Sequence, residues 1–124
     1  MKPQKTLLLV DHARQLEHCR AALEQSGYAV LIARGARQGL KLFVSNPVDA
    51  VVLDGAAERK RNGDSMAARM RKHNPHVRIV MTGTALPESV LYLADGFFDN
   101  RNRPEFFPML VDRLLRREKR ANAA

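Results

Sequence analysis

The chain has 124 residues, 45% of them hydrophobic and 27% charged, a composition that suits one globular domain and leads us to expect residues 1–124 to fold as a unit. No apolar run reaches the length of about 18 residues that spans a bilayer, and the first residues lead into a short strand instead of a cleavable signal, so we expect no membrane partner and a cytoplasmic protein. The net charge of +8 favours a nucleic acid, an anionic surface or an acidic protein as partner, without choosing among them.

The first half of the chain alternates short apolar runs with helical patterns. Residues 6–10 form a continuous apolar run typical of a strand that is buried on both faces. Apolar side chains then recur at helical spacing up to Gly27, which can end a helix, and residues 28–33 predict a second strand. Another helical stripe ends before Pro47 and is followed by a third strand at residues 50–53.

The second half continues the same alternation after a small, charged segment at residues 55–63, which indicates an exposed loop. The expected elements that follow are a short helix around residues 66–70, a strand at 77–82, a helix over 86–94, a strand at 96–99, and a last helix from about 110 that runs into a basic tail from about 117.

Five strands that alternate with five helices predict an α/β fold with a doubly wound, five-stranded parallel sheet and right-handed crossovers. The first strand is not followed by a glycine-rich dinucleotide or nucleoside triphosphate motif, so the sequence does not support such sites. Ligands of doubly wound sheets bind at the carboxyl ends of the strands, where Asp11, Asp54 and Thr82 fall. We therefore expect a functional site at this edge.

Five short motifs mark the strands of the predicted sheet. They are Leu-Leu-Leu-Val-Asp at 7–11, Gly-Tyr-Ala-Val at 27–30, Asp-Ala-Val-Val-Leu-Asp at 49–54, Val-Met-Thr-Gly at 80–83 and Ala-Asp-Gly-Phe-Phe at 94–98. Because the motifs occur in this order and at these spacings, the chain resembles the receiver domains of bacterial response regulators over nearly its whole length. The resemblance implies a flavodoxin-like sheet with strand order 2-1-3-4-5.

The resemblance also implies a chemistry, in which a histidine kinase or a phosphotransfer protein transfers a phosphoryl group to Asp54 of a signalling module that is not itself an enzyme. It implies a switch hydroxyl at Thr82 and a switch aromatic side chain at Phe97. A magnesium ion would be held by Asp11, Asp54 and the backbone carbonyl of Ala56, and a downstream protein would be the output partner.

Two positions depart from the family pattern, since His12 stands in place of an acidic magnesium ligand and Asn100 in place of a lysine. Imidazole is a poor substitute for a carboxylate toward magnesium, so we expect weak Mg²⁺ binding and slow phosphorylation. Arg101, or the loop cations Arg59 to Arg61, could restore some positive charge. We also expect a trans peptide between Asn100 and Arg101, and a last helix that begins late with Pro108 in its first turn.

Each candidate residue also has a purely structural interpretation. Asp11 could cap a helix, Thr82 could be a strand-end hydroxyl, Phe97 could belong to the core, and Cys19 fits a buried, inert thiol. A zinc or manganese site formed by Asp11, His12 and Asp54 is a further alternative.

Two functional hypotheses follow from these observations. The first is a stand-alone receiver-like module of a phosphorelay, which accepts phosphate weakly at Asp54 or acts as a phosphorylation-independent adaptor. The second is a small basic domain that binds nucleic acid or another polyanion through the cationic clusters at residues 59–61 and 113–120, which are otherwise solvated faces.

Overall fold

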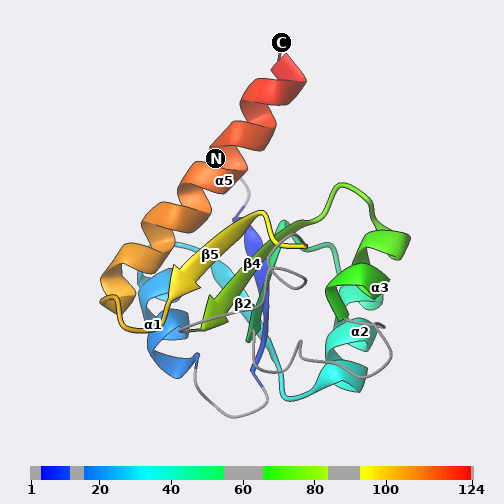
Figure 1. The fold of residues 1–124 in the computed structure, drawn as a ribbon, viewed down its shortest axis with the longest axis horizontal. Helices are drawn as coiled ribbons and strands as arrows, with labels where there is room; N and C mark the ends of the chain where they lie inside the picture. Colours follow the sequence, from blue (N-terminus) through cyan, green and yellow to red (C-terminus); the bar gives the residue numbers. More distant parts are fainter. Residues whose placement is uncertain (1–3, 12–15, 55–65, 84–92, 124) are drawn as a thin grey trace.

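The computed structural model describes residues 4–11, 16–54, 66–83 and 93–123, with the backbone alone from residue 117. Within these ranges, strands and helices alternate along the chain (Figure 1). The elements are β1 (Thr6–Val10), α1 (Glu17–Gln25), β2 (Ala29–Ala33), α2 (Ala36–Ser45), β3 (Ala50–Asp54), α3 (Met66–His73), β4 (Arg78–Gly83), β5 (Gly96–Asp99), the short 3-10 helix η3 (Pro104–Phe106) and α5 (Phe107–Ala123).

The five strands form one parallel sheet in the order β2-β1-β3-β4-β5, which confirms the predicted flavodoxin-like fold. β3 is the middle strand of this order, and β1 is an interior strand that pairs with β2 on one side and with β3 on the other. The register aligns the last residue of β3, Asp54, with Thr82 of β4. The carboxyl ends of the strands therefore meet at one edge of the sheet.

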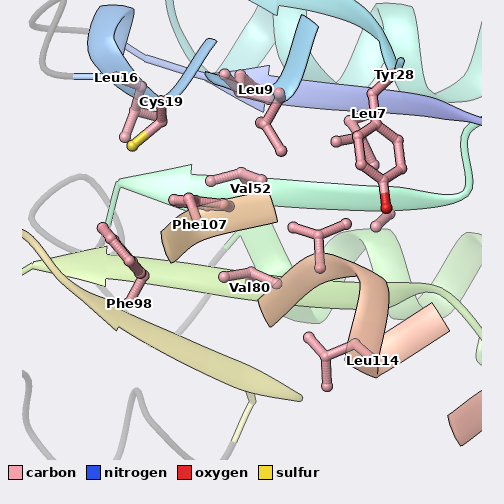
Figure 2. Close-up of a cluster of buried hydrophobic side chains, with 13 residues drawn as sticks. Leu7, Leu9, Leu16, Cys19, Tyr28, Val52, Val80, Phe98, Phe107 and Leu114 are labelled. Atoms are coloured by element: carbon pink, nitrogen blue, oxygen red, sulfur yellow. The ribbon is translucent and has the colours of Figure 1, made fainter. Parts of the chain in front are cut away.

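The sheet has a separate hydrophobic core on each face, because successive side chains of a strand point to opposite faces. Leu7 and Leu9 pack with α1 and α5 on one face, and this cluster includes the residues drawn in Figure 2. Leu8 and Val10 pack on the other face, where α2 and α3 lie (Figure 1). Burial on both faces explains why the strands are continuous apolar runs instead of alternating ones.

Helix α5 closes the first core against the edge strand β5. The rings of Phe98 and Phe107 lie 4.7 Å apart between their centroids. The hydroxyl of Tyr28 donates a hydrogen bond to Asp112 and thereby joins α5 to the segment that leads into β2. A side chain at Gly96 would require Leu114 to shift, because an added Cβ would lie 2.8 Å from Leu114 Cδ1.

The start of the last helix and the peptide bond before it agree with the predictions from the sequence, whereas the end of this helix does not. Pro108 is the second residue of α5, so the late start of this helix is confirmed. The peptide between Asn100 and Arg101 is trans, since the described residues include no cis peptide bond. The basic segment from residue 117, expected as a tail, continues α5 to Ala123 because arginine, lysine, glutamate and alanine are all good helix formers.

Three other expected segments lie wholly or largely outside the described residues: the start of the first helix, the loop at 55–63 and most of the helix at 86–94. The helix α1 is described from Glu17. Among the described residues, no helix is long and apolar enough to cross a membrane.

Candidate functional site

Three buried polar side chains gather at the carboxyl edge of the central strands. Asp11, Asp54 and Thr82 are each at most 1% exposed, and they are the buried polar or charged residues of the described chain. Asp54 ends β3 beside Thr82 of β4, while Val10 pairs with Leu53, so Asp11 follows at the level of Asp54. Burial of a carboxylate costs free energy unless it is compensated, so two such groups at one edge indicate a site.

The carboxylate of Asp11 is held from two sides. The backbone N–H of Leu16, just before α1, donates to its Oδ2 over 3.1 Å. The guanidinium of Arg34 donates to the same oxygen over 3.4 Å. The first contact joins Asp11 to Leu16, where no side-chain cap hydrogen bond is made, and a capping role for Asp11 stays a prediction because residues 12–15 lie outside the described residues. The second contact adds a positive charge that was not predicted from the sequence.

Arg34 follows β2 and lies between three elements of the site. Its Nη2 donates to Glu17 Oε1 of α1 over 3.0 Å, and its backbone N–H donates to Gln38 Oε1 of α2 over 2.8 Å. The sequence contained enough information to place Arg34 near this site, because β2 neighbours β1 in the predicted strand order. A cation directly after β2 therefore falls at the same edge as Asp11.

The described residues alone do not make up a magnesium site. They include no cluster of three or more histidine, cysteine, aspartate or glutamate side chains that could hold a metal ion. Magnesium demands near-octahedral oxygen ligands, whereas Asp11 already accepts hydrogen bonds from a guanidinium and a backbone amide. His12 and the carbonyl of Ala56, and with them the zinc or manganese alternative, lie outside the described residues.

Arg101 pairs with Asp99 and does not reach into the buried site. Its Nε and Nη2 donate to the Asp99 carboxylate over 3.0 and 2.6 Å, and its side chain is 73% exposed. These hydrogen bonds lower the pKa of Asp99 to about 2. In this arrangement, the suggestion that Arg101 replaces the missing lysine charge is not supported. Arg59 to Arg61 lie outside the described residues.

The two aromatic residues of β5 differ in their surroundings. Phe98 is buried in the first core, whereas Phe97 is 37% exposed. The interpretation of Phe97 as a core residue is therefore wrong, because Phe98 takes that place. Asn100, at the position of the family lysine, is exposed, and its backbone N–H donates to the carbonyl of Gly83 over 2.9 Å.

The cationic cluster of the last helix is described only in part. Arg113 and Arg116 are exposed on α5, as expected for solvated side chains. The side chains of Arg117, Lys119 and Arg120 lie outside the described residues.

A family model and several solved structures match this chain. The model of the response regulator receiver domain matches residues 7–94, which is more than half of the chain. No curated protein matches the chain. The match covers β1 from its second residue, all of β2, β3 and β4, and the three buried polar residues of the site.

Solved structures with the same fold include the CheY-like receiver domain protein from Methanospirillum hungatei, with a TM-score of 0.83 and 18% identity over 96% of this chain and 99% of that one. The chemotaxis response regulator of Vibrio cholerae has a TM-score of 0.74 and 19% identity over 90% of this chain and 99% of that one. A streptococcal redox sensor described as evolved from two-component response regulators has a TM-score of 0.82 and 17% identity, over 96% of this chain and 54% of its own. At these identities, the likeness is one of fold.

Proposed function

Because the chain belongs to the response regulator receiver domain family, we propose that it is a phosphorelay module in which Asp54 accepts a phosphoryl group slowly and a downstream protein is the output partner. Receiver domains are signalling domains, not classical enzymes, and the family implies a kinase or a phosphotransfer protein as donor. The observation that carries the proposal is the buried Asp54 carboxylate beside Thr82 at the carboxyl edge of the sheet.

The proposed reaction uses Asp54 as a nucleophile. A carboxylate oxygen of Asp54 attacks the phosphorus atom of a phosphohistidine, the P–N bond breaks with its electron pair on the imidazole nitrogen, and an acyl phosphate forms. The Thr82 hydroxyl, level with Asp54 in the sheet, would donate a hydrogen bond to a phosphoryl oxygen. Receiver domains typically bind Mg²⁺, but Asp11 and Asp54, the acidic residues described at this edge, supply too few of the oxygen ligands that this ion prefers, so the proposed step does not use it.

Electrostatics are the reason for a slow reaction. The phosphoryl group would add negative charge next to Asp11, which is itself a buried carboxylate. Asn100 carries no charge, and Arg101 is engaged with Asp99. Two unit charges about 4 Å apart interact by roughly 4 kcal/mol at an effective dielectric constant of 20, so one absent lysine is enough to slow the transfer.

An exposed apolar set supports a protein partner for this module. Phe97 on β5, Phe106 in η3 and Met109 in the first turn of α5 are all exposed large hydrophobic side chains. Aromatic side chains and methionine are enriched at protein interfaces. These residues would serve the output contact whether or not Asp54 carries phosphate, which is the adaptor form of the proposal.

Intact-mass measurement after incubation with a small acyl phosphate donor tests the role of Asp54. We expect slow, partial addition of one phosphoryl group to the wild type and none to Asp54→Asn. Asn100→Lys should raise the rate about tenfold, since about 1.4 kcal/mol of transition-state stabilisation corresponds to that factor. With MgCl₂ in the buffer, combination with His12→Asp should raise it further, because a carboxylate is a better ligand for magnesium than imidazole.

The matched control is Asn102→Lys, which adds the same charge two residues along the chain at an exposed position. Its rate should equal that of the wild type. Phosphate that is still incorporated into Asp54→Asn would refute the assignment of the phosphoacceptor. Rapid, stoichiometric phosphorylation of the wild type would refute the proposed slow transfer.

A further inference from the structure

We propose that Arg34 is an internal counter-cation for Asp11, and that it disfavours divalent metal binding at the acidic edge of the sheet. The inference deepens the proposed function, since it concerns the same site. Its test measures metal binding, so it does not depend on whether Asp54 accepts phosphate.

The burial of Asp11 is the first observation behind this inference. Its side chain is fully buried at the end of β1, next in the sheet to the strand that carries Asp54. A buried carboxylate is stable only when it is paired and hydrogen-bonded. The guanidinium of Arg34, at 3.4 Å, supplies a positive charge, and the N–H of Leu16, at 3.1 Å, supplies a hydrogen bond.

The second observation is that one carboxylate oxygen accepts both hydrogen bonds. A carboxylate oxygen has about two acceptor positions, and the contacts from Arg34 and Leu16 both end on Oδ2 of Asp11. A metal ion that used this oxygen as a ligand would have to displace one of the two donors. It would also bring a double positive charge next to a guanidinium, which is unfavourable.

The third observation is that the position of Arg34 is set by its neighbours. Glu17 accepts from its Nη2 over 3.0 Å, and Gln38 accepts from its backbone N–H over 2.8 Å. The side chain is 41% exposed, so it reaches inward from the surface between α1 and α2 with its charge directed at the buried carboxylate. A guanidinium suits this place because its planar donors can serve Asp11 and Glu17 together.

The inference predicts that removal of the guanidinium charge creates metal affinity. We expect isothermal titration calorimetry with MgCl₂, and separately with MnCl₂, to show at least about tenfold tighter binding for Arg34→Gln than for the wild type. Arg34→Gln combined with Asp11→Asn should lose this gain. The matched control is Arg37→Gln, which removes the same charge from an exposed residue of α2 and should bind metal as the wild type does.

Thermal unfolding followed by circular dichroism tests the same prediction through the melting temperature, which can also be measured for less stable variants. The melting temperature of Arg34→Gln should rise with added MgCl₂ relative to EDTA, because a ligand that binds the folded state stabilises it, whereas Arg37→Gln should show the wild-type response. If Arg34→Gln does not fold, Asp11→Asn decides the matter, since it keeps the arginine and is nearly isosteric. We expect it to leave the response of the wild type to MgCl₂ unchanged.

Two outcomes would overturn the inference. One is a folded Arg34→Gln that binds Mg²⁺ no better than Arg37→Gln. The other is a wild type whose melting temperature rises with MgCl₂ and whose response is lost in Asp11→Asn, because Asp11 would then be a metal ligand despite Arg34. A failure of phosphate transfer to Asp54 would leave both results interpretable and would count against the proposed function alone.

Discussion

Cys19 illustrates how position alone changes the chemistry of a single side chain. It lies in α1 and packs into the first core, where it is only 6% exposed (Figure 2). Burial raises the pKa of its thiol to about 11, and the negative charge of Asp11 adds to the effect. Since the thiolate is the reactive form of cysteine, the thiol should be unreactive near neutral pH, in agreement with the prediction from the sequence.

This pKa gives Cys19 a measurable effect on stability in alkali. Below the ordinary pKa of 9.0, the thiol is protonated in the folded and in the unfolded chain, and its contribution to the free energy of unfolding is fully present. Between pH 9 and about pH 11, the unfolded chain releases the proton while the folded chain retains it, so the free energy of unfolding falls. We expect the wild type to lose about 2 kcal/mol more than Cys19→Ala between about pH 8 and pH 10.5.

Urea denaturation of both proteins at the two pH values measures this difference. The alanine variant serves as the control, because every other group that titrates in alkali is common to the two proteins. Parallel losses of stability would contradict the prediction and would mean that the thiol ionises equally easily in the folded chain.

At the scale of elements, α3 is tied to the sheet by hydrogen bonds from one arginine. Arg71, in the last turn of α3, donates to the carbonyls of Val77 and Leu93 over 3.2 and 2.7 Å, and to Asp95 Oδ2 over 3.0 Å. The same carboxylate oxygen accepts from the N–H of Ile79 at the start of β4, over 2.8 Å. One guanidinium thus joins the end of α3, the entry to β4 and the segment before β5.

We expect Arg71→Ala to lower the free energy of unfolding by about 2 to 3 kcal/mol, because it leaves two carbonyls and the Asp95 carboxylate without this donor. The control is Lys72→Ala, which removes a cation from the exposed face of the same helical turn and should change stability by less than about 0.5 kcal/mol. Urea denaturation at neutral pH measures both. Equal losses in the two variants would show that the network adds no stability.

At the scale of the whole molecule, one sheet carries both hydrophobic cores. Leu8 and Leu9 are adjacent in β1, yet they belong to different cores, and both are fully buried. β1 is an interior strand of the sheet, paired with β2 on one side and with β3 on the other, so loss of packing in either core should destabilise the same strand. The chain should therefore unfold as one domain.

We expect Leu8→Ala and Leu9→Ala each to cost about 3 to 4 kcal/mol, within the range for buried leucines, with a single transition in both cases. Circular dichroism and tyrosine fluorescence should give coincident unfolding curves. Val44→Ala is the control, because this side chain is 60% exposed and its loss should cost little. Separate transitions for the two probes would contradict the prediction of a single domain.

Local patterns in the sequence determined the elements and one edge of the site. Strand and helix periodicity depends on backbone geometry, so the alternating runs were enough to predict the parallel sheet. The strand order was implied by the resemblance to receiver domains. Because parallel strands end at a common edge, the sequence was enough to place Asp11, Asp54 and Thr82 together.

Only the tertiary structure decided where the charged side chains point. The contact of Arg34 with Asp11 joins residues 23 positions apart, and it depends on the strand order together with the rotamer of a long side chain. Arg101 found a partner two residues away in Asp99 and not in the buried site. A flexible cation has several acceptors within reach, and packing and desolvation, which no local pattern encodes, select among them.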